Sequence, residues 1–420
     1  MTDRKDSGFA KHFLWGAATA AHQVEGDNHN QWTVWELENA KAKAAAAEFH
    51  LQDYPKWDKI KDQAKHPYNY VSDNLADHYN NYEKDFEFLR KMHMNTYRFS
   101  IEWSRVEPQE GAWNVEAVTH YKQYLAELKR RDIEPVVTLM HFTLPVWFAA
   151  KGGFGHRSNA KHFVHFAERI ISELGSDIRY IVIINEPEVY AHESYYLGEW
   201  PPNERSKFGT WRVLMNQAHA FKKASRAIHR LNRRYKVGVA KNMTHFYPGD
   251  SAWLSHVSAR IASYFAGDYI LKKFTKHSDF IGLNYYQSQR VFGYRLHNPE
   301  DQPYSDVNWM LAPGDIEYVL EDLHGKYKLP ILITENWLAD ADDEYRQWWI
   351  KETIVAMQKA MKRGAKLIGY LHWSLMDNFE WAYGKWPRFG LVAVDYKTGQ
   401  RTLRPSAIWF GGVIKKLRGL

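Results

Sequence analysis

Hydrophobic and polar positions along the chain divide it into short apolar runs and longer amphipathic stretches. Eight apolar runs are bounded by polar or turn residues, as expected for buried strands: Phe13–Ala18, Thr96–Ile101, Glu134–Met140, Tyr180–Glu186, Lys236–Ala240, Phe280–Tyr286, Ile331–Glu335 and Leu367–Ser374. The stretches that repeat apolar residues every three to four positions predict helices: Ala76–Met92, Val115–Arg131, Ala160–Leu174, Trp211–Arg234, Trp253–Phe274, Tyr345–Lys362 and Pro405–Leu417.

This alternation of strand and helix favours an α/β fold with a parallel sheet, and eight repeats favour closure into a single (β/α)8 TIM barrel. A doubly wound open sheet is the alternative, but no glycine-rich phosphate turn follows the first strand. No linker interrupts the chain, so residues 1–420 are predicted to form one domain. The segment Ala40–Glu48 is predicted to be a surface helix.

Three strands are followed by unusually long segments, Ala21–Asp73, Pro187–Lys207 and Gln287–Pro313. In a barrel these segments lie at the carboxyl ends of the strands, where functional residues gather. We therefore expect long strand-to-helix loops that surround a deep pocket.

Two of the apolar runs end at a glutamate. Glu186 closes the fourth run and precedes Pro187, and Glu335 closes the seventh run. Each of these two buried strands would carry one carboxyl group at its end. Together they would supply the acid and the nucleophile or base that hydrolysis of a glycosidic bond requires. This pair is the principal functional signal of the sequence.

Other strand ends supply polar partners for these acids. Arg98 lies in the second run, His141 comes directly after the third, and Asn284 and Tyr286 lie in the sixth. The eighth run leads into Trp373–Trp381, where an acid, Glu380, stands among aromatic residues.

The two glutamates are expected to have different protonation states. The apolar strand before Glu186 raises a carboxyl pKa by desolvation, as a proton donor needs. Glu335 must be ionised to attack, and Arg98 and Tyr286 are the candidates to stabilise it. Because the fourth and seventh strands face each other across a narrow barrel mouth, a separation of roughly 5 Å and the retaining mechanism are expected.

Composition narrows the substrate and the location. Aromatic residues make up 15% of the chain, including 18 Trp and 26 Tyr, which suits stacking on sugar rings. The net charge of +7 is dispersed and accompanies no nucleic-acid motif, so no nucleic-acid partner is expected. Cysteine is absent, no apolar run is long enough to span a membrane, and no metal-ligand spacing is present. These features predict a cytoplasmic protein without a metal or cofactor, and with neither a membrane nor a nucleic acid as its partner; they do not give the oligomeric state.

Several motifs in order resemble glycoside hydrolase family 1, the β-glucosidase and β-galactosidase group, along nearly the whole chain. The resemblance rests on Phe13–Gly26, Tyr97–Ser104, Asn185-Glu186-Pro187, Ile333-Thr334-Glu335-Asn336, and Trp373–Trp381 with Arg388-Phe389-Gly390-Leu391.

This resemblance implies a (β/α)8 barrel, double displacement with Glu335 as nucleophile and Glu186 as acid then base, and no cofactor. It also implies that a small carbohydrate binds Gln23, His141, Asn185, Glu380 and Trp381, with Trp373 as a stacking floor and Tyr286 bonded to the nucleophile. Phe389 belongs to the same C-terminal block, and Arg98 and Asn284 would be supporting residues. A glutamate at position 380 implies a neutral sugar rather than a 6-phosphorylated one.

Two residues depart from the family pattern. Phe142 stands where a tryptophan usually follows the third-strand histidine, and Trp337 stands where the nucleophile motif usually has glycine. Trp337 either adopts a strained positive φ or projects close to the site, where it would narrow the route to the leaving-group side. A mainly transglycosylating enzyme and a non-catalytic sugar-binding barrel remain the alternatives, the latter weakened because both glutamates are retained.

Overall fold

The computed structural model describes residues 8–297, 299 and 302–420. Within this part of the chain, eight parallel strands form a closed barrel in the order β5-β4-β3-β2-β1-β9-β8-β6, and pairing between β5 and β6 closes the ring. The strands are β1 (Leu14–Ala18), β2 (Thr96–Ser100), β3 (Glu134–Thr138), β4 (Tyr180–Asn185), β5 (Lys236–Pro248), β6 (Phe280–Phe292), β8 (Ile331–Asn336) and β9 (Leu367–Trp373). The predicted (β/α)8 barrel is confirmed.

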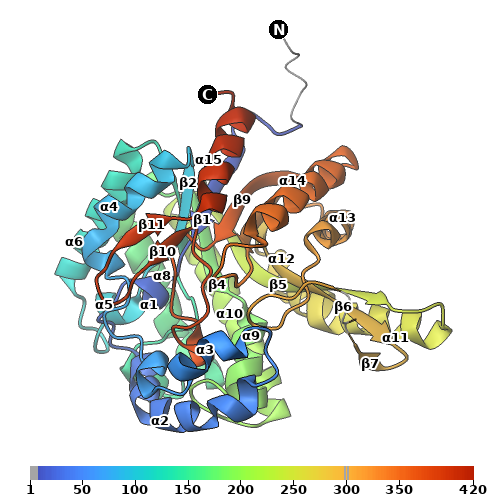
Figure 1. Ribbon diagram of the computed structural model, residues 1–420. Helices are drawn as coiled ribbons and strands as arrows, with labels where there is room; N and C mark the ends of the chain where they lie inside the picture. Colours follow the sequence, from blue (N-terminus) through green and yellow to red (C-terminus); the bar gives the residue numbers. More distant parts are fainter. Residues whose placement is uncertain (1–7, 298, 300–301) are drawn as a thin grey trace.

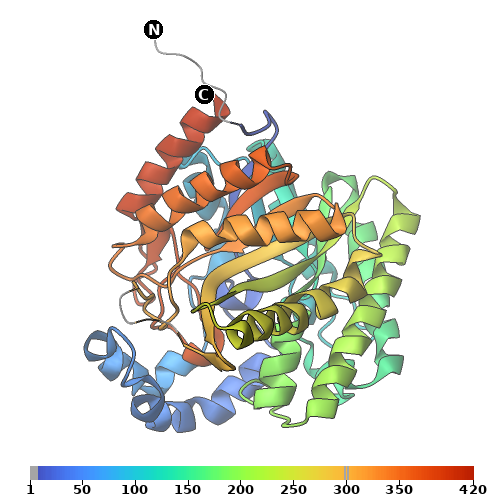
Figure 2. The same ribbon diagram turned by 90° about the vertical axis from the view of Figure 1, so that its right-hand side faces the viewer.

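Helices surround the strands and pack one apolar side against them (Figures 1 and 2). The outer helices are α4 (His78–Lys91), α6 (Val115–Arg130), α8 (Ala160–Leu174), α10 (Lys207–Leu231), α12 (Tyr269–Thr275), α13 (Ile316–Tyr327), α14 (Arg346–Lys362) and α15 (Pro405–Arg418). In α8, for example, Phe163, Ala167 and Ile170 recur at helical spacing and are fully buried. Their burial is what fixes such a helix on the barrel.

Short elements complete the loops. At the carboxyl ends of the strands lie α1 (Ala21–Val24), α2 (Gln31–Leu51), α3 (Trp57–Ala64), α5 (Trp103–Val106), α7 (Val146–Ala150), α9 (Pro187–Ala191) and α11 (Trp253–Ser263). The two-residue strand β7 (Arg295–Leu296) pairs with β6, and β10 (Val392–Val394) pairs with β11 (Arg401–Leu403). In Figure 1, α2 and α3 lie at the lower end of the barrel, while α11 and β7 project to the lower right. No helix among the described residues is long and apolar enough to cross a membrane.

The first long loop is more ordered than predicted. The surface helix expected at Ala40–Glu48 is part of the 21-residue helix α2, which begins where the Asn30 side chain accepts hydrogen bonds from the amides of Trp32 and Thr33. An N-cap of this kind satisfies amides that have no partner within the helix. Lys41, Ala42 and Ala45 are exposed, as expected of a surface helix, whereas Ala40, Ala44 and Ala47 are buried on its other side.

Two strands are longer than predicted. β5 and β6 continue past Ala240 and Tyr286 because they pair with each other beyond the barrel, for example His245 with Ser288. This pairing satisfies the backbone hydrogen-bonding groups of both strand extensions. Because it joins residues far apart in the sequence, the local hydrophobic pattern does not predict it.

Two helix predictions also need correction. The predicted helix Trp253–Phe274 is divided into α11 and α12 by a π-helical turn, η6 (Tyr264–Asp268). Helix α13 was not predicted, although Ile316, Leu320 and Leu323 have helical spacing and face the core.

Candidate active site

Glu186 and Glu335 meet at the carboxyl ends of their strands. Glu335 belongs to β8, and Glu186 follows β4 with its backbone in the left-handed region, φ 41°. The Tyr286 hydroxyl lies 2.8 Å from Glu186 Oε1 and 2.7 Å from Glu335 Oε2, so these two carboxyl oxygens are at most about 5.5 Å apart. Both side chains are buried. The sequence-predicted pair is therefore brought together around one tyrosine.

Arg98 is the cation beside Glu335. It lies on β2 with no exposed surface, and its Nη1 donates to Glu335 Oε1 at 2.5 Å. Its Nη2 donates to Asn185 Oδ1 at 2.7 Å, and its Nε donates to the Thr138 hydroxyl at 3.0 Å. Because the guanidinium is held at three points, it fixes the orientation of Glu335 as well as its charge.

Asn284 holds the other carboxyl group. Its Nδ2 donates to Glu186 Oε1 at 2.7 Å and to Asn185 Oδ1 at 3.2 Å. The Thr334 hydroxyl donates to Asn284 Oδ1 at 2.6 Å, which sets the orientation of the amide. The supporting residues Arg98 and Asn284 thus each bind one glutamate and share Asn185.

Burial raises the pKa of both glutamates, but their neighbours shift the two pKa values differently. The charge of Glu335 further raises the pKa of Glu186 well above its usual value. At Glu335, Arg98 and the Tyr286 hydroxyl oppose the effect of burial on the pKa. The proton shared by the pair therefore resides on Glu186. The Tyr286 hydroxyl lies within donating distance of both carboxyl groups, and because a phenol has one hydrogen it can donate to only one of them at a time.

A cavity of about 730 Å³ opens above the two acids. Among the residues that line it are Gln23, His141, Trp373, Glu380 and Trp381, all predicted to bind sugar. The His141 ring lies nearly parallel to the rings of Trp373 and Trp381, at centroid distances of 5.6 and 6.2 Å. These flat rings give the cavity a wall suited to the C–H face of a sugar.

Polar atoms without a protein partner point to where a ligand would bind. Gln23 Oε1 and His141 Nδ1 are both buried and form no hydrogen bond. Gln23 Nε2 and Asn378 Nδ2 donate to Glu380 Oε2 at 3.3 and 2.8 Å. Burial raises the pKa of Glu380 to about 8, and burial together with Arg98 lowers the pKa of His141 well below its usual value. The cavity therefore offers neutral donors and acceptors to hydroxyl groups, because buried polar atoms require partners.

Phe389 and Asn185 differ from the other predicted sugar-binding residues. Phe389 is fully buried, does not line the cavity and packs edge-on against Trp337 at 4.2 Å. Asn185 lies beneath the cavity and bonds to Arg98 and to His141, the latter at 3.3 Å. Phe389 and Asn185 therefore contact the residues that face the cavity and hold them in position.

Trp337 projects into the cavity rather than straining the backbone. Its φ is not positive, so the predicted strain is absent, and its indole lines the cavity. The ring packs against Tyr286 at a centroid distance of 4.6 Å and against Trp309 at 4.7 Å. Trp337 thus contacts the tyrosine that joins the two acids.

Sequence reasoning missed one wall of the cavity. The α2 residues Trp35, Asn39, Lys43, Ala46 and Ala47 line it, and Trp309 does so from the segment between β7 and α13. Their spacing of three to four residues was a usable signal, but it did not show which way the helix faced.

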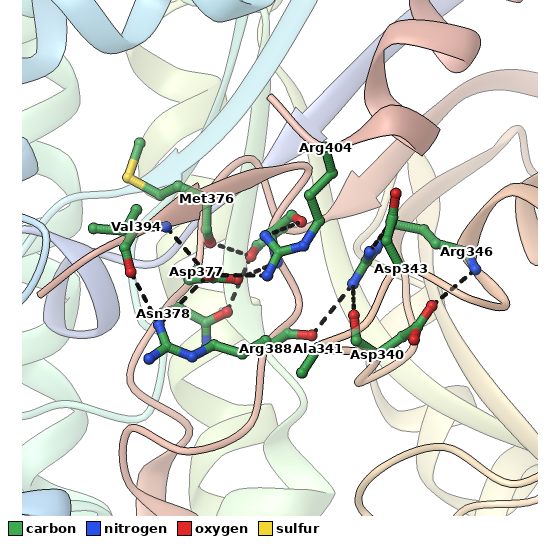
Figure 3. A network of polar contacts seen from close by, with 12 residues as sticks. Asp340, Ala341, Asp343, Arg346, Met376, Asp377, Asn378, Arg388, Val394 and Arg404 are labelled. Carbon is green, nitrogen blue, oxygen red and sulfur yellow. Dashed lines mark hydrogen bonds and ion pairs between the residues drawn. The ribbon is translucent and has the colours of Figure 1, made fainter. Parts of the chain in front are cut away.

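An ionic network behind the cavity joins the loops that carry Trp337 and Phe389 (Figure 3). Asp377 accepts from Arg404 at 3.2 Å, from Arg388 at 3.4 Å and from the Gly390 amide at 3.0 Å. Arg346 Nη2 donates to the carbonyl oxygens of Asp340 and Arg388 at 2.8 and 3.3 Å. The segment after β8 is therefore tied to the segment after β9.

We expect Asp377→Asn to lower the free energy of unfolding by about 3 kcal/mol, because removing one partner leaves Arg404 and Arg388 partly buried without their counter-ion. Urea unfolding followed by far-UV circular dichroism measures this. Asp342→Asn is the control: Asp342 pairs with Lys56 and Lys59 at the surface, and a change below about 1 kcal/mol is expected there. Equal effects of the two substitutions would contradict a structural role for the network.

Among the described residues, no group of three or more His, Cys, Asp or Glu side chains is arranged to hold a metal ion. The arrangement of the two glutamates instead supports acid–base and nucleophilic chemistry by the side chains themselves.

Comparisons with known proteins agree with this geometry. The sequence profile described as Glycosyl hydrolase family 1 matches residues 5–276 and 265–418. Beta-glucosidase A of Thermotoga maritima is 28% identical over 97% of this chain and 98% of its own, and 6-phospho-beta-galactosidase of Clostridium acetobutylicum is 27% identical over 96% of each. The solved structure of a beta-glycosidase from Pyrococcus horikoshii superimposes with a TM-score of 0.85 and 31% identity, over 97% of this chain and 95% of the other.

Proposed function

This chain belongs to glycoside hydrolase family 1, and on that premise we propose that it is a retaining β-glycosidase of the β-glucosidase type. Its substrates would be terminal, non-reducing β-linked glucosyl or related residues on short oligosaccharides and on aryl or alkyl alcohols. The observation that carries the proposal is the shared contact of Glu186 and Glu335 with Tyr286. It keeps the carboxyl groups within the spacing of about 5–5.5 Å of retaining enzymes, whereas inverting enzymes leave room for a water molecule.

In the first step, the Glu335 carboxylate attacks the anomeric carbon while Glu186 gives its proton to the leaving oxygen. Arg98 keeps Glu335 ionised and oriented, and Tyr286 loses one of its two carboxyl partners as the covalent bond forms. In the second step, Glu186, now ionised, removes a proton from water, which attacks the same carbon and releases Glu335. Both displacements invert the anomeric centre, so the product retains the β configuration.

The glycone is best supported as a neutral sugar. Burial raises the pKa of Glu380 to about 8, so below that pH its carboxyl group is a neutral partner for a sugar hydroxyl, and at no pH does it supply the cation that a 6-phosphate needs. The cations that line the cavity, Lys43 and Arg205, belong to α2 and to the segment before α10 rather than to the loop that carries Glu380.

An aryl-glycoside panel tests this function: glucoside, galactoside, fucoside, mannoside and the 6-phosphates of the first two. We expect turnover of the neutral β-glucoside or a close relative, with the β anomer as the first product in ¹H NMR. The α anomer as first product, or hydrolysis of the 6-phosphates alone, would refute the proposed mechanism or substrate class respectively.

The pH dependence follows from the two pKa shifts. Glu335 must be ionised, so kcat/KM falls as the pH decreases through its pKa. Glu186 must be protonated, so kcat/KM falls as the pH rises through its pKa, which lies well above 4.5. We expect a bell-shaped profile whose basic limb disappears in Glu186→Ala but persists in Glu380→Gln. If the basic limb disappears in Glu380→Gln instead, it reports the titration of Glu380, and its assignment to Glu186 is wrong.

Trp337 is expected to contribute to leaving-group binding. Trp337→Gly should raise KM for an aryl glucoside about three- to tenfold, because it removes a ring that borders the cavity next to Tyr286 and Trp309. Trp337→Phe, which keeps a ring, should lie between. Steady-state kinetics with aryl and methyl glucosides, and inhibition by glucose, measure the effect. Unchanged constants in Trp337→Gly would show that the indole has no part in binding.

A further inference from the structure

Helix α11 has its large apolar side chains on the outside. Ser255 and Ala259 are buried against the barrel, whereas Trp253, Leu254 and Ile261 are exposed. Tyr264 and Phe265, at the start of η6, are exposed as well. At 100° per residue these five positions fall within an arc of about 120°, so they form one continuous stripe. This is the reverse of the usual surface helix, whose apolar side faces the core.

A second segment extends the stripe. The turn between β6 and β7 contacts the start of α11, where the Gly293 amide donates to Ser255 Oγ at 2.7 Å. Gly293 also lies close to the Leu254 side chain. Tyr294 on this turn is 77% exposed, Trp253 is 76% exposed, and Phe265 at the far end of the stripe is 59% exposed. We call Trp253, Leu254, Ile261, Tyr264, Phe265 and Tyr294 the aromatic patch. In Figure 2, α11 lies in front of the barrel with no other element over it.

Cations border the aromatic patch. Lys272 Nζ lies 5.2 Å from the centre of the Tyr264 ring, and the Arg295 guanidinium lies 5.6 Å from the centre of the Tyr294 ring. Arg260 is exposed at the edge of the stripe. Of the nearby acids that the structure describes, Asp268 and Asp322 are both paired with Lys326, and Asp250 lies just before α11.

We propose that the aromatic patch is a peripheral docking surface for an anionic lipid bilayer. Exposed aromatic and aliphatic side chains rimmed by lysine and arginine match the interfacial region of such a bilayer, where apolar groups enter the acyl boundary and cations meet the headgroups. Pairing with a second copy of the chain is less favourable, because like charges would face each other around the same apolar centre.

The position of the patch gives the proposal a functional consequence. β5 and β6 line the cavity through Asn242, Thr244 and Tyr286, and the same strands continue outward to α11 and to the turn that carries Tyr294. The patch and the cavity mouth therefore lie at the same end of the barrel, so that docking would hold the mouth near the lipid surface. The sequence prediction of no membrane partner rested on the lack of a spanning segment and did not address peripheral contact.

Co-sedimentation with large unilamellar vesicles tests the proposal, using the full chain and either phosphatidylcholine alone or phosphatidylcholine with 30% phosphatidylglycerol added as the probe. We expect binding to the anionic vesicles that weakens with salt, and weaker binding to the neutral ones. The double substitution Trp253→Ser/Phe265→Ser should reduce binding about tenfold or more. Phe49→Ser is the matched control, since Phe49 is 79% exposed on α2, away from the patch, and it should bind as the unaltered chain does.

Hydrolysis of a soluble aryl glycoside should be the same in all three proteins, which verifies folding independently of docking. Absence of vesicle binding, or binding that the double substitution leaves unchanged, would overturn the proposal. So would a dimer in analytical ultracentrifugation that the double substitution converts to monomer, because the patch would then be a subunit interface.

Discussion

Glu335→Gly is expected to lower kcat for every glycoside by at least about 10⁴-fold, because the variant has no group to capture the anomeric carbon. The loss should not depend on the leaving group, since without a nucleophile even an activated aryl glycoside cannot form the intermediate. Azide should restore part of the rate by occupying the space of the missing carboxylate. Its product should be the α-glycosyl azide, because a single displacement inverts the centre.

Glu199→Ala is the control for this substitution, because Glu199 lines the cavity but pairs with Lys43 at the rim. Its rate should stay within a few-fold of the unaltered chain. A Glu335→Gly variant whose kcat falls by less than about 10²-fold without azide, or that yields the β-azide, would show that another residue is the nucleophile.

Glu186→Ala is expected to have an effect that depends on the leaving group. Loss of general acid catalysis should lower kcat/KM by about 10²- to 10⁴-fold for alkyl glycosides and disaccharides. A dinitrophenyl glycoside, whose leaving group needs no proton, should be affected far less in the first step. Because the base for the second step is also missing, the covalent intermediate should accumulate and give a burst of aryl alcohol.

Azide distinguishes the two acids. In Glu186→Ala it should attack the glycosylated Glu335 from the opposite side and give the β-glycosyl azide. Stopped-flow absorbance measures the burst, and NMR identifies the anomer. Equal losses for alkyl and dinitrophenyl substrates would contradict the role of Glu186 as proton donor.

The barrel could be predicted from the sequence because each of its strands is a short, locally apolar run. The longer course of β5 and β6 could not, because it depends on their pairing with each other outside the barrel. The same holds for α2: its alanine-rich segment predicts a helix, but only the packing shows that Ala46 and Ala47 face the cavity.

The candidate site shows the same division. The strand ends identified Glu186 and Glu335, and their neighbours predicted which would hold the proton. Sequence could not show that one hydroxyl, Tyr286 Oη, contacts both acids, or that Trp337 contacts Tyr286. These contacts join residues more than 40 positions apart, so no local pattern encodes them.

Helix α2 forms a cavity wall within one excursion of the chain between β1 and β2. Ala42, Ala46 and Ala47 present small side chains to the cavity from this helix, and no barrel strand carries them. A combinatorial library at these three positions would reshape the space open to the departing alcohol while the hydrolytic centre stays intact. For an engineer seeking a new glycoside donor or acceptor, α2 is therefore the part of this protein to diversify first.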